Sequence, residues 1–196
     1  MAEIGRTLAV MVKAPVAGAV KTRLARDVGT VEAVRFYRAC TARLLRRVGQ
    51  DPRWRTLLAV APDRAACLPL WPAECRRTPQ GPGDLGARMQ RLLDLPAPGP
   101  VVIVGSDIPG ITAAHVADAF RLLGRHDLVF GPASDGGYWL VGARRRPRTP
   151  RPFVGVRWST EHALADTVAN ARGPVGLLPT LADVDDAAGW LDWRRG

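Results

Sequence analysis

The sequence alternates between short apolar runs and longer amphipathic stretches, and this alternation constrains the fold more than any other feature. The apolar runs are bounded by Gly, Pro or Asp, and several are continuous enough to be buried on both faces of a sheet. They span residues 8–12, 56–60, 101–104, 128–130, 138–141 and 175–178. Strands that alternate with helices predict an α/β fold with a mostly parallel sheet covered on both sides.

The amphipathic stretches predict the helices. Residues 30–48 carry apolar side chains at helical spacing, with arginines on the opposite face. Thr112 is expected to cap a second helix and Ser159 or Thr160 a third. Asp186 is expected to cap the final helix. In a sheet of this kind, the ligand site lies beyond the carboxyl ends of the strands.

Size and composition fit one globular domain over residues 1–196, since 47% of the residues are hydrophobic and 23% are charged. Cys40, Cys67 and Cys75 are odd in number and lack the spacing of a disulfide framework or a zinc site. No apolar run approaches the roughly 18 residues of a membrane span. We therefore expect a soluble, unprocessed, cytoplasmic protein with no membrane partner; the sequence predicts no oligomeric state.

The formal net charge of +10 raises the question of a nucleic-acid partner. The densest basic run, residues 144–151, is interrupted by prolines and has no interleaved aromatic residues for stacking bases. No helix-turn-helix, zinc-finger or RRM pattern is present. Nucleic-acid binding is therefore not favoured, and this run is interpreted as a solvated loop or as a loop that meets an anionic substrate.

Only two of the 28 basic residues are lysines, and both lie in one turn. Lys13 and Lys21 flank a segment with Pro15 and Gly18, directly after the first apolar run. Backbone N–H groups and compact ammonium charges at a strand end favour phosphate binding. The spacing is not that of a Walker A loop, which argues against a P-loop ATPase. The alternative is a tight turn whose lysines face water.

Acidic residues follow two of the predicted strands. Asp107 comes three residues after a buried run, where a carboxylate can hold a divalent cation against phosphate; a turn Asp bonded to its own backbone is the alternative. Asp183 and Asp185 share a face if the chain is extended, and two such carboxylates repel unless a cation joins them. The alternative for this late segment is an acid-rich helix start.

Two glycine-rich segments have the character of ligand loops. In residues 80–88, backbone can approach a flat ligand, and Asp84 can cap the following helix or bond a nucleobase. In residues 131–142, Asp135 precedes Gly136 and Gly137, which permit positive φ or a close substrate. Each segment is equally compatible with an ordinary turn.

Five segments in this order resemble a bacterial family of small GT-A-like transferases. The segments are K-A-P-V-A-G-A-V-K-T-R-L, G-D-L-G-A-R, V-G-S-D-I-P-G-I, G-P-A-S-D-G-G-Y-W-L-V-G, and F-V-G-V-R-W-S-T followed by D-V-D. The family is related to nucleotide-diphospho-sugar transferases and to 2-phospho-lactate guanylyltransferases. The resemblance covers almost the whole chain and implies a GT-A, Rossmann-like three-layer α/β/α sandwich.

The resemblance also implies roles for individual residues. The residues implied to bind the nucleotide are Lys13, Pro15, Gly18, Lys21, Thr22, Arg23, Gly83, Asp84, Leu85, Arg88 and Ser106. Those implied to face the acceptor are Asp135, Gly136, Gly137, Tyr138, Trp158, Ser159 and Thr160. Lys21, Asp107 and Asp135 would be catalytic, and Asp107 would bind Mg²⁺ or Mn²⁺ together with Asp183 or Asp185. The chain departs from the D-x-D form of many glycosyltransferases, because Ser106-Asp107-Ile108 offers one carboxylate.

The expected activity is metal-dependent transfer from a nucleotide-activated donor to a small acceptor. Nucleotidyl transfer from a nucleoside triphosphate to an anionic acceptor is preferred, because two lysines and an arginine suit the triphosphate charge. Glycosyl transfer from a nucleotide-sugar is the runner-up, and a non-catalytic nucleotide-binding protein is a third hypothesis. No obligatory covalent nucleophile is evident, since Cys40 lies in an amphipathic stretch and the three histidines lack triad spacing.

Overall fold

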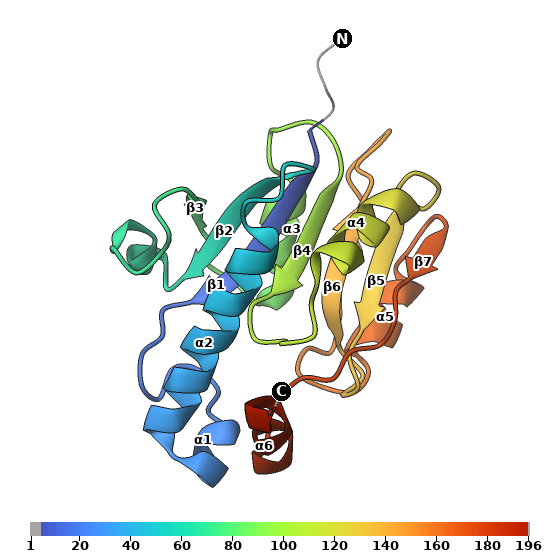
Figure 1. The fold of residues 1–196 in the computed structure, drawn as a ribbon. Helices are drawn as coiled ribbons and strands as arrows, with labels where there is room; N and C mark the ends of the chain where they lie inside the picture. The colour runs from blue at the N-terminus through green and yellow to red at the C-terminus, as the bar shows by residue number, and fades with distance from the viewer. Residues whose placement is uncertain (1–4, 196) are drawn as a thin grey trace.

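The computed structural model describes residues 5–195, and one seven-stranded sheet organises them. The strand order is β3-β2-β1-β4-β6-β5-β7, and β6 alone runs antiparallel to its neighbours (Figure 1). The strands are β1 (Thr7–Lys13), β2 (Arg55–Ala61), β3 (Arg76–Pro79), β4 (Val101–Gly105), β5 (Leu128–Pro132), β6 (Tyr138–Ala143) and β7 (Val175–Leu177). The predicted α/β architecture with a mostly parallel sheet is confirmed.

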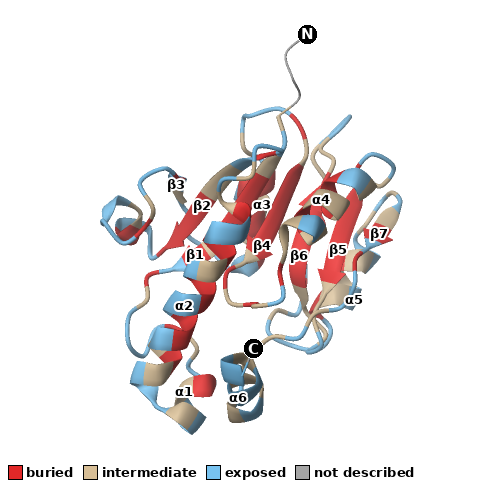
Figure 2. Ribbon diagram, viewed as in Figure 1, coloured by how far each residue is buried: buried red, intermediate tan, exposed pale blue. Residues whose placement is uncertain are grey.

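Helices cover both faces of the sheet. They are α1 (Leu24–Val28), α2 (Thr30–Val48), α3 (Leu85–Leu93), α4 (Ala113–Leu122), α5 (Ala163–Ala169) and α6 (Ala187–Arg195), with a short 3-10 turn η1 (Asp63–Cys67). In β1, Leu8, Val10 and Val12 pack with α2 and α4, whereas Ala9 packs with α3 on the opposite face. The burial pattern shows buried strands between helices whose outer faces are exposed (Figure 2).

All six predicted strands are present, with ends that differ by a few residues. The sequence pattern missed β3, whose four residues Arg-Arg-Thr-Pro include no large apolar side chain and are mostly exposed. An edge strand has one neighbour and little to bury, so its sequence need not be apolar. Among the described residues, no helix has the length and apolar character required to cross a membrane.

Most of the predicted helix starts are correct. Thr112 caps α4 by accepting a hydrogen bond from the His115 amide, and Asp84 caps α3 by accepting one from the Ala87 amide. The prediction that Ser159 or Thr160 caps the third helix was wrong. Helix α5 begins at Ala163, and the Thr160 hydroxyl instead donates a hydrogen bond to the Arg157 carbonyl. The Thr160 side chain thus closes a turn before the helix.

The arginine run lies at the other end of the sheet from the strand ends expected to hold the ligand. It follows the end of β6, which pairs there with the beginning of β4. Within it, Arg145 donates to the carbonyls of Leu95, Ala97 and Gly99. Arg144 and Arg151 pair with Asp127 and Asp94. The interpretation of this run as a loop that meets substrate is therefore not supported.

The three cysteines differ in exposure, and this predicts their reactivity. Burial, with the nearby charge of Asp107, raises the pKa of the Cys40 thiol to about 12, and burial also raises the pKa of Cys75. Cys67 is exposed. Because the thiolate is the reactive form, iodoacetamide at pH 8 should label Cys67 and leave Cys40 and Cys75 unmodified. Peptide mass spectrometry measures this, with the denatured protein as the control in which all three react; equal labelling of Cys40 and Cys67 in the native protein would contradict it.

Candidate functional site at the carboxyl ends of the strands

A cavity of about 600 Å³ lies where β1, β4 and β5 end, next to the beginning of β6. Most of the residues singled out in the sequence line it. From the nucleotide set these are Lys13, Lys21, Gly83, Asp84, Leu85, Arg88 and Ser106. From the metal and acceptor sets they are Asp107, Asp183, Asp185, Asp135, Gly137, Tyr138, Trp158, Ser159 and Thr160. Segments from near the two ends of the chain, such as those of Lys13 and Asp185, thus meet at one site.

Five of the predicted residues do not line this cavity: Pro15, Gly18, Thr22, Arg23 and Gly136. Arg23 nevertheless approaches it, because its Nη1 lies 3.4 Å from Asp185 Oδ2. Gly18 has a φ of +77°, which shapes the turn between the two lysines. Pro15 faces a separate cavity on the other side of this turn.

Lys21 is the centre of the site's charge network. Its ammonium lies 3.0 Å from Asp107 Oδ2 and 2.8 Å from Asp185 Oδ1, and its side chain is only 5% exposed. Burial lowers the pKa of Lys21, but Asp107 and Asp185 outweigh that effect and leave the pKa raised. The backbone at Lys21 has a φ of +48°, a conformation uncommon outside glycine. The turn thus directs this ammonium between two carboxylates instead of toward open solvent.

The carboxyl groups of Asp183 and Asp185 have pKa values shifted in opposite directions. Burial, together with the charges of Asp185 and Asp135, raises the pKa of Asp183 above its ordinary value. Burial alone would raise the pKa of Asp185 too, but the hydrogen bond from Lys21 holds it below the ordinary value. Asp107 accepts no hydrogen bond from its own turn among the described residues, so the simple turn interpretation does not describe it.

This donor set fits a hard divalent cation. Asp107 and Asp185 already converge on one cationic atom, and carboxylate oxygens are the ligands that Mg²⁺ and Mn²⁺ prefer. Asp183 lines the same cavity, and besides its burial the nearby charge of Asp185 raises its pKa. Within residues 5–195, no group of three or more His, Cys, Asp or Glu side chains is close enough to form a complete metal site from protein ligands.

Two polar residues of the site were not identified from sequence. The Lys13 amide donates to Tyr37 Oη at 2.7 Å, and this hydroxyl also bonds Ser106 Oγ at 2.9 Å. Burial raises the pKa of Tyr37, although the bonds with Ser106 and Lys13 oppose the rise. Gln80 is buried and donates from Nε2 to the carbonyls of Val12 and Ala59. Together Tyr37 and Gln80 tie the ends of β1, β2 and β4 to one another.

The glycine-rich segment before α3 forms one wall of the cavity. Arg88 Nε donates to the Gly83 carbonyl at 3.0 Å, which fixes the turn that Asp84 caps. Trp158 packs against the first turn of α3, and a Cβ at Gly86 would lie 2.8 Å from the Trp158 ring. Gly86 is therefore explained by the close approach of an indole ring.

The turn between β5 and β6 also lines the cavity. Asp135 accepts a hydrogen bond from the Gly137 amide at 2.9 Å, which makes it a turn-forming residue as well as a cavity residue. Gly136 has a φ of +83°, and a Cβ there would lie 2.2 Å from the Glu161 carbonyl oxygen. Gly136 is thus required because the neighbouring backbone leaves no room for a side chain, and it does not itself line the cavity.

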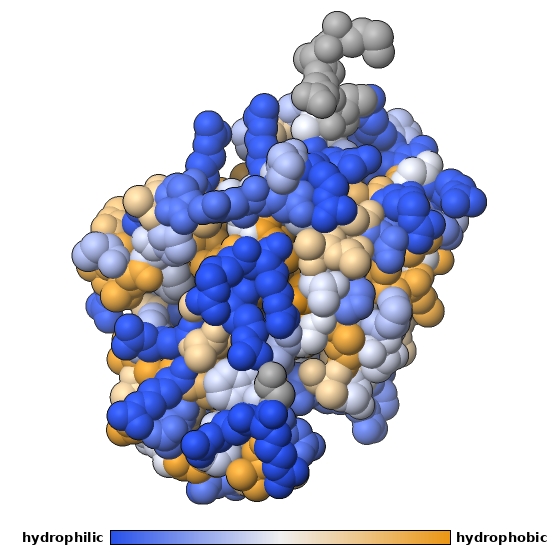
Figure 3. All heavy atoms as spheres, viewed as in Figure 1, coloured by the Kyte–Doolittle hydropathy of each residue, from blue (hydrophilic) through white to orange (hydrophobic). Residues whose placement is uncertain are grey.

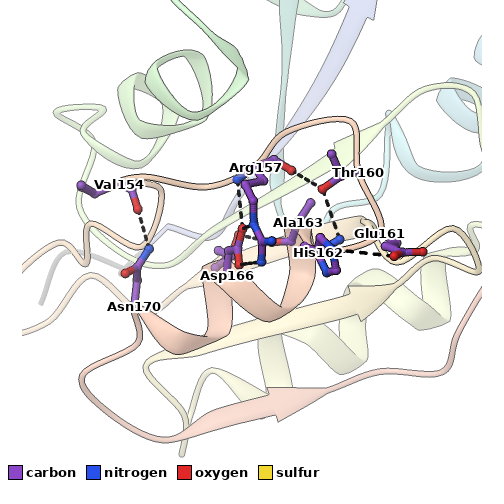
Figure 4. A network of polar contacts seen from close by, with 9 residues as sticks. Val154, Arg157, Thr160, Glu161, His162, Ala163, Asp166 and Asn170 are labelled. Carbon is purple, nitrogen blue, oxygen red and sulfur yellow. Dashed lines mark hydrogen bonds and ion pairs between the residues drawn. The ribbon is translucent and has the colours of Figure 1, made fainter.

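The loop that carries Trp158, Ser159 and Thr160 is held by a polar network (Figure 4). Arg157 forms a bidentate ion pair with Asp166 on α5, and Asp166 also accepts from the Arg157 amide. The hydrogen bonds from Arg157 hold the pKa of Asp166 at about 2, against an ordinary value of 3.8. Asn170 Nδ2 donates to the carbonyls of Pro152 and Val154, which fixes the beginning of the loop.

Asp166→Asn should loosen this loop without unfolding the protein. The substitution removes the charge that binds both the guanidinium and the amide of Arg157, and a partly exposed pair of this kind contributes modestly. Amide exchange in residues 153–162 should therefore become about three- to tenfold faster. In the wild type the ion pair is complete above pH 3.8 and is lost as the pH falls toward 2.

Hydrogen exchange followed by mass spectrometry measures this effect. Asp118→Asn is the matched control, because it breaks another exposed Asp–Arg pair, with Arg121 on α4. Unchanged exchange in residues 153–162 of Asp166→Asn would show that the network does not hold the loop.

Comparison with known proteins identifies the family. Residues 44–160, more than half of the chain, match the family model DUF2064, described as "Uncharacterized protein conserved in bacteria". A crystal structure from Desulfovibrio desulfuricans G20, provisionally assigned as a nucleotide-diphospho-sugar transferase, is 34% identical. Its TM-score is 0.82, and the match covers 92% of this chain and 82% of that one. The search of curated proteins finds no match.

More distant solved structures share the fold. The manganese complex of Rv0371c from Mycobacterium tuberculosis H37Rv is 17% identical with a TM-score of 0.53, and the match covers 97% of each chain. CMP:2-keto-3-deoxy-manno-octonic acid synthetase complexed with CTP is 11% identical with a TM-score of 0.59, and the match again covers 97% of each chain. The chain therefore belongs to the DUF2064 family, and it shares the α/β fold of these solved structures.

Proposed function

We propose that this protein is a metal-dependent transferase that uses a nucleotide-activated donor, and that its reaction is nucleotidyl transfer from a nucleoside triphosphate to a small anionic acceptor. The observation that carries the proposal is the convergence of Lys21, Asp107 and Asp185 in the cavity at the strand ends. Carboxylates that share one cation suit a metal site, and adjacent ammonium groups suit phosphate.

In this proposal, the donor lies between two walls of the cavity. Lys13 and Lys21, with Arg23 at the rim, would bind the phosphates, and the segment 83–88 would lie beside the base. Asp107 and Asp185 would hold Mg²⁺ or Mn²⁺, with Asp183 close by and the remaining positions taken by phosphate oxygens and water. The bound metal would neutralise phosphate charge and stabilise the leaving group.

The acceptor would enter from the β5–β6 side of the cavity. Asp135 and Gly137 line the cavity there, and Trp158, Ser159 and Thr160 line the same cavity. The loop fixed by Arg157 and Asp166 would position the acceptor, while the lysines hold the donor in line with it. Rate enhancement would come chiefly from orientation and electrostatic stabilisation, because the site offers no evident covalent nucleophile.

Glycosyl transfer from a nucleotide-sugar is the second candidate. The 34% identical relative with its provisional assignment as a nucleotide-diphospho-sugar transferase favours it. The two reactions differ in the product released, since nucleotidyl transfer gives pyrophosphate and glycosyl transfer gives a nucleoside diphosphate. The third hypothesis, binding without catalysis, rests on the absence of a D-x-D pair of carboxylates at Ser106-Asp107-Ile108. Asp185 offers a second carboxylate beside Asp107, which weakens the argument for binding without catalysis.

Thermal stabilisation tests the proposal without knowledge of the acceptor. Purified protein is melted with each nucleoside triphosphate and each common nucleotide-sugar, with and without Mg²⁺ or Mn²⁺. A ligand at 100 times its Kd adds roughly 2.7 kcal/mol to stability. A metal-dependent shift with one triphosphate supports nucleotidyl transfer and identifies the base, and a shift with a nucleotide-sugar alone supports glycosyl transfer. No shift with any of them would contradict both.

A further inference from the structure

A second cavity, of about 870 Å³, lies outside the site described above. One wall is α2, which presents Arg38, Ala42 and Arg46 along one face, and the other is the segment of residues 69–75 that follows η1. In the space-filling view, hydrophobic surface lies between the hydrophilic side chains over α2 and the segment on the left (Figure 3). Nothing in the proposed transfer reaction requires this space.

The walls of this second cavity are held in place. Trp71 is buried in the far wall, and its Nε1 donates to the Ala65 carbonyl at 2.9 Å. At the end of α2, Gln50 Nε2 donates to Glu74 Oε1 at 3.1 Å and so joins the two walls. A cavity with fixed walls can bind a ligand without a large ordering cost.

The lining has one apolar part and one cationic part. Leu45, Leu70 and Trp71 provide the apolar surface, and Leu70 is 49% exposed although it faces the cavity. Arg38 and Arg46 lie on the α2 side, and neither forms an ion pair within the described residues. The one lining carboxylate, Glu74, accepts a hydrogen bond from Gln50. Two uncompensated guanidinium groups beside apolar surface complement a ligand with an apolar body and an anionic head.

We propose that this second cavity binds a small amphipathic anion, with an aromatic or acyl body against Leu70 and Trp71 and a carboxylate, sulfonate or phosphate head at Arg38 and Arg46. A volume of this size is within the range of small-molecule sites. The cavity also contacts Pro15 and Val16 of the lysine turn, and Tyr37 lines both cavities. The ligand would therefore lie directly behind the turn that carries Lys13 and Lys21, at a site separate from theirs.

Fluorescence titration with 8-anilinonaphthalene-1-sulfonate tests the proposal, because this probe has an aromatic body and one anionic head. Ala42→Trp fills the cavity from the exposed face of α2 and should weaken binding at least about tenfold. Leu70→Glu places a carboxylate on the opposite wall and should do the same without changing the helix. Arg46→Gln should weaken binding about three- to tenfold. The control Arg148→Gln removes the same charge from an exposed loop at the other end of the sheet and should change nothing.

A matched neutral probe separates the two parts of the lining. N-phenyl-1-naphthylamine lacks the sulfonate, so it should bind more weakly, and Arg46→Gln should not affect it. A saturating nucleoside triphosphate with Mg²⁺ should leave 8-anilinonaphthalene-1-sulfonate bound. Inorganic phosphate alone should not displace it either. Unchanged affinity in both Ala42→Trp and Leu70→Glu would overturn the proposal. The proposal would also be overturned if the nucleoside triphosphate displaced the probe and the two variants bound the probe as tightly as the wild type does. That result would place the probe in the first cavity. Neither outcome bears on the proposed transfer reaction, which uses the other cavity.

Discussion

Asp107→Asn is expected to reduce turnover about 10²- to 10³-fold while the fold is retained. The substitution keeps the shape of the side chain and removes the charge that, in our proposal, binds the metal opposite the phosphates. The side chain is 38% exposed, so an amide there is not buried without partners. The measurement is the rate of pyrophosphate or nucleoside diphosphate release with the donor that the thermal screen identifies, in the presence of Mg²⁺ or Mn²⁺.

The control for this result is Asp192→Asn, which neutralises an exposed aspartate on α6 that pairs only with Arg195 among the described residues. A second readout, the affinity for Mn²⁺ measured by electron paramagnetic resonance, does not depend on the acceptor. Asp107→Asn should weaken Mn²⁺ binding and Asp192→Asn should not. Turnover and Mn²⁺ affinity equal to those of the wild type in Asp107→Asn would exclude this carboxylate from the metal site.

The location of the site could be predicted because it follows from topology. Lys13, Asp107 and Asp135 each come within a few residues after a run that reads as a strand, and strand ends of one direction meet at the same end of the sheet. The residues after these runs therefore converge whatever the details of their loops. In the structure the arginine run lies away from the site, because residues 144–151 follow β6, the one strand that runs in the opposite direction.

The pairing of charges within the site could not be predicted. Lys21 and Asp185 are 164 residues apart, and their contact depends on the positive φ at Lys21 and on the path of the chain after β7. Tyr37 was missed because the helical period places it on the apolar face of α2, where an aromatic ring is expected in the core. Only its hydroxyl, at the end of that buried ring, reaches Lys13 and Ser106. Because the Tyr37 ring belongs to the core, its position in the sequence shows only the helical pattern of a core residue and gives no sign of its role in the site.

Lys21→Met should produce opposite changes in catalysis and metal binding. Turnover should fall about 10²-fold or more, because a charge that stabilises the phosphates is lost. The affinity for Mn²⁺ without nucleotide should rise about tenfold. In the wild type, an incoming cation must displace the ammonium from Asp107 and Asp185, and each charge-assisted hydrogen bond contributes about 1.5–3 kcal/mol. In the variant both carboxylates are available to the metal from the start.

Lys13→Met is the matched control, since it removes the chain's other lysine from the same cavity without any contact to Asp107 or Asp185 among the described residues. It should weaken triphosphate binding and leave the Mn²⁺ affinity of the free protein nearly unchanged. The comparison separates direct competition from a general effect of positive charge, because a field effect would change both variants alike. A lower or unchanged Mn²⁺ affinity in Lys21→Met would mean that the metal does not bind between these two carboxylates. A selective rise would indicate that Lys21 holds the carboxylates together until the metal arrives, and that it is then free to bind phosphate.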